Sequence, residues 1–76
     1  MPFKKEFDSK LEPVREIGFI LTEIKEIATY SEIKITNKGN GIYIARVGFQ
    51  PVIEKDREEI TEKITRLLEK HMWEKE

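Results

Sequence analysis

The 76-residue chain contains no cysteine and only one histidine. Without cysteine it has no disulfide, no thiolate metal ligand and no cysteine nucleophile. A domain this short buries only about 60–70% of the surface that its unfolded chain exposes, so its stability margin is small. Association with another chain is the remaining common way to stabilise such a domain, and the composition therefore favours self-association.

The sequence also lacks long apolar runs and any excess of charge. No run is long enough to span a membrane, and the start Met-Pro-Phe-Lys-Lys lacks the apolar core of a secretory signal, so we expect a cytoplasmic protein without a membrane partner. Fourteen basic and 15 acidic residues leave a net charge of −1. This balance gives no global field for nucleic acid, so such a site would be local. Abundant Glu, Lys and Ile are typical of heat-adapted proteins and of AT-rich genomes.

Residues 31–49 are predicted to form a β-hairpin. Ile33 and Ile35 alternate with polar residues, as in a half-buried strand. Lys38-Gly39-Asn40-Gly41 supplies residues that adopt positive φ at little cost, so the chain reverses there. The second strand, residues 42–49, is apolar on both faces, which is the most informative feature of the sequence.

Two helices are predicted to flank this hairpin. An apolar stripe with helical period predicts one helix over residues 13–29, where Pro13 suits a first turn, and Ser9 offers an alternative cap. A narrower stripe predicts the second helix over residues 54–72. Residues 1–12 are interpreted as an N-terminal arm or a kinked helical extension, because Phe3, Phe7 and Leu11 are spaced by four.

The order of these elements predicts an α+β fold, a two-layer α-β-β-α arrangement in a single domain, residues 1–76. The antiparallel hairpin packs under two helices and is completed to a larger sheet by dimerisation. A two- or four-residue loop would place Ile33, Ile35, Ile42 and Ile44 under the helices, whereas a three-residue loop would place Tyr43, Ala45, Val47 and Phe49 there. Either register leaves large apolar side chains uncovered, and a second copy is the simplest cover.

The interface residues expected from this argument are Tyr43, Val47 and Phe49. Trp73 is added, because on a continued helix it would point away from the core stripe and tryptophan is enriched at interfaces. Phe19 projects among glutamates on the polar side of its helix. Its expected cover is the N-terminal segment carrying Phe3 and Phe7, and a partner contact is the alternative.

No catalytic, metal-binding or cofactor-binding site is predicted. His71 falls at the end of the last helix, where packing or capping explains it better than catalysis does. Glutamate pairs lie on helix faces rich in lysine and arginine, as expected of a solvated surface. A basic and aromatic hairpin could contact nucleic acid through a set of four residues. These residues are Lys34, Lys38, Asn40 and Arg46.

The sequence therefore favours a small non-enzymatic, homo-oligomeric interaction or regulatory module, most simply a homodimer. The alternative is a small nucleic-acid-binding protein that uses the hairpin. An active site assembled around His71 at a subunit boundary is a third hypothesis.

Overall fold

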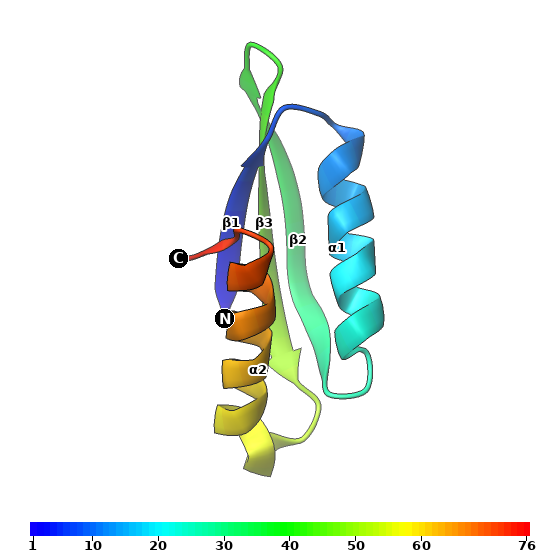
Figure 1. Ribbon diagram of the computed structural model, residues 1–76, viewed down its shortest axis with the longest axis vertical. Helices are drawn as coiled ribbons and strands as arrows, with labels where there is room; N and C mark the ends of the chain where they lie inside the picture. The colour runs from blue at the N-terminus through cyan, green and yellow to red at the C-terminus, as the bar shows by residue number, and fades with distance from the viewer.

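A computed structural model describes all residues of the chain, 1–76. It contains four strands and two helices in the order β-α-β-β-α-β (Figure 1). A short 3-10 turn, Glu54–Asp56, precedes the second helix. The elements are β1 (Pro2–Phe7), α1 (Leu11–Ile24), β2 (Ala28–Gly39), β3 (Ile42–Pro51), α2 (Arg57–Lys70) and β4 (Glu74–Lys75).

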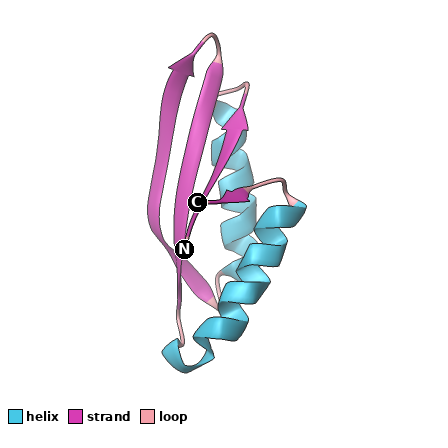
Figure 2. Ribbon diagram, turned by 90° about the vertical axis from the view of Figure 1, so that its left-hand side faces the viewer, coloured by secondary structure: helices cyan, strands magenta, loops and turns pink.

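The strands form one antiparallel sheet in the order β2-β3-β1-β4. Strands lie on one side of the molecule and both helices on the other (Figure 2). The element order is that of the ferredoxin-like, or split βαβ, motif. The predicted α+β class is confirmed, but the hairpin is extended to a larger sheet by β1 and β4 of its own chain, beside β3.

Residues 1–12 are neither an arm nor a helical extension over most of their length, because Pro2–Phe7 forms strand β1. β1 pairs with β3 along its whole length, from Pro2 opposite Gly48 to Phe7 opposite Tyr43. Phe3 and Phe7 are buried and point towards the helices. A spacing of four places two residues on one face of a strand as well as on one face of a helix, so the pattern fitted both structures.

The hairpin adopts the second of the two expected registers. Ile33 lies opposite Val47 and Ile35 opposite Ala45, so odd-numbered residues of both strands face the helices. The turn holds Gly39, Asn40 and Gly41 at positive φ, as predicted for this loop. The loop itself has only two residues, Asn40 and Gly41, because Gly39 pairs with Ile42. The bulge between Asn37 and Gly39 produces the register that was expected of a three-residue loop.

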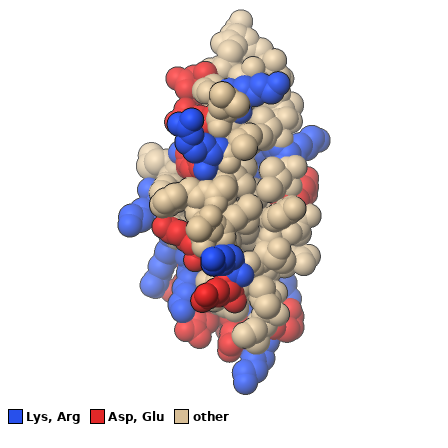
Figure 3. All heavy atoms as spheres, turned by 90° about the vertical axis from the view of Figure 1, so that its right-hand side faces the viewer, with Lys and Arg blue, Asp and Glu red and all other residues tan.

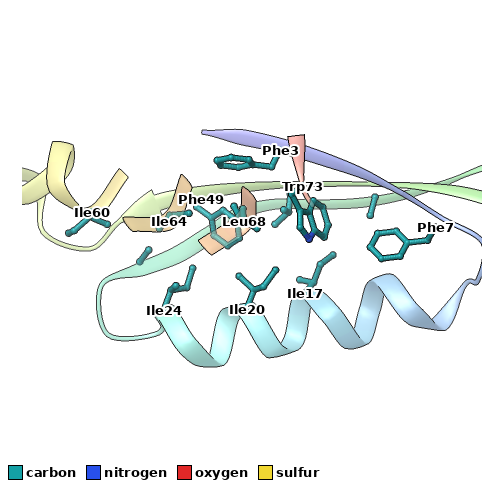
Figure 4. Packing of buried hydrophobic residues seen from close by; sticks show 13 residues of the cluster. Phe3, Phe7, Ile17, Ile20, Ile24, Phe49, Ile60, Ile64, Leu68 and Trp73 are labelled. Atoms are coloured by element: carbon teal, nitrogen blue, oxygen red, sulfur yellow. The ribbon is translucent and has the colours of Figure 1, made fainter. Parts of the chain in front are cut away.

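The hydrophobic core lies between the sheet and the two helices. Figure 4 shows Phe49 and Trp73 between the sheet and α1, from which Ile17 and Ile20 project towards them. Phe3 packs against Phe49 with ring centroids 6.4 Å apart. Ile60, Ile64 and Leu68 of α2 complete this core. These five helix residues, and Ile24 of α1, belong to the apolar stripes that predict the two helices.

The helix α1 begins before Pro13 and ends at Ile24 rather than at residue 29. The Leu11 amide donates to Ser9 Oγ over 3.3 Å, which favours the earlier start. The apolar period continues through Ala28, but Ala28 is already in β2, opposite Pro51. Thr29 and Tyr30 prefer strands, and pairing with β3 ends the helical segment before them.

The helix α2 does not continue to Met72, because the chain reverses directly after His71. The Trp73 amide donates to the Leu68 carbonyl over 2.9 Å and the Met72 amide to the Glu69 carbonyl over 3.0 Å. With Met72 at φ 68°, these bonds form a Schellman motif. The reversal turns Trp73 back into the core, where it is 2% exposed.

Candidate interaction surface

Strand β2 forms a free edge of the sheet. Ten of its 12 residues pair with β3 on one side, and no strand lies on the other. Only Ala28 is buried, and Ile35 is partly buried. An edge strand offers unpaired backbone N–H and C=O groups, so it can accept a further strand.

The helix-facing side of β2 carries exposed apolar side chains. Tyr30 is 54% exposed and Ile33 is 40% exposed. Val14, which is 58% exposed, and Leu21, which is partly buried, lie on one flank of α1. The opposite flank of α1 carries Phe19, which contacts His71 at the end of α2. Since α1 also packs against β2, this flank borders the edge strand. Figure 3 shows a broad uncharged surface on the α1 side of the molecule.

The opposite, open side of β2 carries charge. Glu32, Lys34 and Thr36 alternate with the isoleucines and therefore face away from the helices. Neither Glu32 nor Lys34 takes part in any ion pair of the chain. Lys34 lies directly opposite Arg46, a residue of its own charge. The edge strand thus has two unpartnered charges of opposite sign, two residues apart.

The interface residues expected from the sequence lie elsewhere. Val47 and Phe49 are each 1% exposed and Trp73 is 2% exposed within the single chain. Tyr43 is half-buried on the helix side, opposite Phe7. The prediction for Val47, Phe49 and Trp73 is wrong, because β3 is an inner strand whose helix-facing side both helices cover.

The four residues expected to contact nucleic acid are only partly brought together. Lys34 and Arg46 share the open face with Lys4, which lies opposite Arg46 on β1. Arg46 Nε donates to Glu76 Oε1 over 2.7 Å. Lys38 lies 3.8 Å from Glu6, and Asn40 sits in the exposed turn.

Tyr43, an aromatic residue of the same hairpin, faces the helices and not the open face. The open face of the hairpin therefore presents cations without an aromatic platform. Much of its positive charge is neutralised within the chain by Glu76 and Glu6.

A polar cluster that the sequence did not reveal surrounds Glu16. We call Lys5, Glu16, Trp73 and the His71 carbonyl the Glu16 cluster. Glu16 Oε1 accepts from Trp73 Nε1–H over 2.8 Å and from Lys5 Nζ over 2.9 Å. Lys5 Nζ also donates to the His71 carbonyl over 2.7 Å. The cluster joins β1, α1 and the end of α2, and each polar group in it has a partner, so it is structural.

His71 is the C-cap residue of α2, and its ring packs edge-on against Phe19 with centroids 5.9 Å apart. Phe19 remains 54% exposed. The expectation that Phe3 and Phe7 cover Phe19 is wrong, since both phenylalanines point into the core on the other side of α1.

No group of three or more His, Asp or Glu side chains is arranged to hold a metal ion. Neither helix combines the length and the apolar character needed to cross a membrane. Comparison with protein-family models, with curated proteins and with solved structures gives no match.

Proposed function

We propose that this protein is a small non-enzymatic interaction module that self-associates through the free edge of β2. The proposal includes the cytoplasmic location expected from the sequence. The observation that supports self-association is the 12-residue edge strand β2, which is exposed on both faces. Such a strand binds another strand by main-chain hydrogen bonds, while its alternating side chains supply specificity.

The apolar border of β2 supports association rather than protection of the edge. Soluble proteins guard an edge with inward-pointing charges, proline, edge lysines or bulges, and β2 has two bulges and the open-side Lys34. Here the helix-facing positions of β2 carry Tyr30, Ile33 and Ile35, and the strand contains no proline. An added strand would remove Ile33 and Tyr30 from water, a gain of about 25 cal/mol for each Å² of apolar surface covered.

The mass of the protein in solution tests this proposal. Light scattering coupled to size exclusion should give about twice the 9.0 kDa of one chain at micromolar or higher concentration. Ile33→Lys places a charge at the centre of the edge and should weaken association roughly tenfold or more. Because Ile33 is already 40% exposed, the fold should survive this change.

Met72→Lys is the matched control for this experiment. Met72 is 76% exposed and lies beside β4, at the other edge of the sheet, so its replacement should leave the mass unchanged. A single-chain mass for the unmodified protein throughout the concentration range would contradict the proposal.

Binding of nucleic acid to the open face is the second candidate. The row of Lys34, Arg46 and Lys4 across three strands favours it. Fluorescence anisotropy with a labelled oligonucleotide at low salt tests it, since phosphate contacts are strongest there. Lys34→Ala should weaken any true complex and reduce its dependence on salt, and no binding at low salt would dismiss this candidate.

A further inference from the structure

We infer that the partner of β2 is β2 of a second copy, antiparallel about a two-fold axis at Ile33, with Glu32 of each chain facing Lys34 of the other. This inference rests on the proposed self-association and adds the register and the residues that select it. The two sheets would join into one, with all four helices on the same side.

The two faces of β2 limit the possible registers. Directly opposed residues of an antiparallel pair point to the same face. When the two-fold axis lies at a residue, that residue opposes its own copy. The helix-facing residues of one β2 then oppose helix-facing residues of the other. A shift by one residue would oppose isoleucine to lysine or glutamate and place the helices of the two copies on opposite sides.

The regular part of β2 leaves three central positions for the axis. Bulges interrupt the pairing with β3 between Tyr30 and Glu32 and between Asn37 and Gly39. The stretch 32–37 lies between them. An axis at Glu32 would oppose that carboxylate to itself beside a bulge. An axis at Thr36 would oppose Lys34 to Lys38, and Asn37 borders the other bulge, so Ile33, Lys34 and Ile35 remain.

Charge distinguishes these three positions. An axis at Lys34 would oppose this lysine to its own copy. One at Ile35 would oppose Glu32 to Lys38, which sits at a bulge and already lies 3.8 Å from Glu6. With the axis at Ile33, Glu32 of each chain lies opposite Lys34 of the other, so the symmetry gives two such contacts.

The axis at Ile33 also supplies what each charge lacks in the single chain. Glu32 and Lys34 form no ion pair there, and Lys34 faces Arg46 across the strands. A carboxylate on the outer side of Lys34 relieves that like-charge contact. At the same time, Ile33 meets Ile33 of the second copy on the helix-facing side.

Introduced cysteines test the position of the axis. The chain has no cysteine of its own, so any disulfide comes from the introduced residue. Ile33→Cys should cross-link two chains rapidly under mild oxidation, because a residue on the axis lies within disulfide range of its own copy. Lys34→Cys and Ile35→Cys are the controls. Either variant would cross-link faster than Ile33→Cys only if the axis lay at its own position. The readout is the covalent dimer on a non-reducing gel.

A charge exchange gives a second, independent test. Lys34→Glu and Glu32→Lys should each raise the dissociation constant roughly tenfold, because each variant replaces opposite-charge contacts with like-charge contacts. The double variant should restore it. With the axis at Lys34 the double variant would oppose two glutamates, and with the axis at Ile35 it would oppose the introduced lysine to Lys38.

The outcomes separate this inference from the proposed function. Preferential cross-linking at Ile33 together with restoration in the double variant supports the inference. A dimer that cross-links fastest elsewhere, or that the exchange does not restore, overturns the register but leaves self-association standing. A protein that stays a single chain overturns both. Circular dichroism of each variant verifies that the fold is retained.

Discussion

Glu16 holds three separate parts of the chain together through one carboxylate. It accepts hydrogen bonds from Lys5 on β1 and from Trp73 beyond α2. Trp73 is almost fully buried and its ring meets Phe7 edge-on, with centroids 5.7 Å apart. Glu16 is the acceptor for the N–H of this buried indole, so the cost of losing it falls mainly on Trp73.

Replacing Glu16 should therefore destabilise the protein. Glu16→Ala leaves the indole N–H without a partner and should cost about 1–3 kcal/mol of unfolding free energy, measured by urea denaturation. Glu16→Gln keeps an acceptor for the indole and should cost less. Emission from the single tryptophan reports whether Trp73 stays buried.

Glu23→Ala on the same helix is the control for Glu16. Glu23 is exposed and forms no ion pair, so the change should stay within about 0.5 kcal/mol. Equal stability losses for Glu16→Ala and Glu23→Ala would show that the Glu16 cluster adds nothing.

At this scale the sequence predicted a packing or capping role for His71 but assigned Trp73 to an interface, whereas Trp73 is buried in the core. A capping and packing histidine is what the structure contains. Trp73 was misplaced because the chain reversal has Met72 at the position that glycine usually occupies. Glu16 lies beside the apolar stripe of α1, and nothing in its local sequence indicates a partner 57 positions away.

At the scale of the elements, two glycines have opposite roles. Gly41 in the hairpin turn has φ 78°, and a Cβ there would meet no atom within 4 Å. Gly18 sits inside α1, and a Cβ there would also meet no atom within 4 Å. Side-chain packing therefore affects neither position, and the backbone conformation decides the effect of a substitution.

The same substitution should change stability in opposite directions at these sites. Gly41→Ala forces an L-residue into the left-handed region and should cost about 1–2 kcal/mol. Gly18→Ala removes backbone freedom from the unfolded chain and should stabilise α1 by about 0.5–1 kcal/mol. Chemical denaturation measures both, and the same sign for both would refute this account.

The elements could be predicted from sequence where one periodicity dominates. The stripes of Ile17, Ile20 and Ile24 and of Ile60, Ile64 and Leu68 identified both helices, and the glycine turn identified the hairpin. β1 was missed because its two phenylalanines fit either period. The sequence predicted that the hairpin joins a second copy, but it did not indicate that β2 is the edge left free. That outcome depends on β1 pairing with β3, and this pairing joins residues far apart in the sequence.

At the scale of the whole molecule, the surface available for association lies on β2 rather than on β3, where the sequence placed it. The apolar surplus of β3 is largely covered by helices of the same chain. The surface that remains open to association is the unpaired edge of β2, together with the bordering flank of α1. If association uses this edge, folding and assembly are linked by mass action.

The thermal midpoint should then rise with protein concentration. Mass action favours the dimer over unfolded chains as the concentration increases. Differential scanning calorimetry over a wide concentration range should show this rise for the unmodified protein and a much smaller one for Ile33→Lys. A midpoint independent of concentration in both proteins would contradict association through β2.

The sheet has one long continuous edge, the 12-residue β2, whereas its second edge is made of the two-residue β4 and the part of β1 that β4 leaves uncovered. A subunit that has used its long edge has little left to offer a third chain. Filaments need two such edges on every molecule, so polymerisation should stop after the first pairing. Concentrated solutions should accordingly remain free of fibrils.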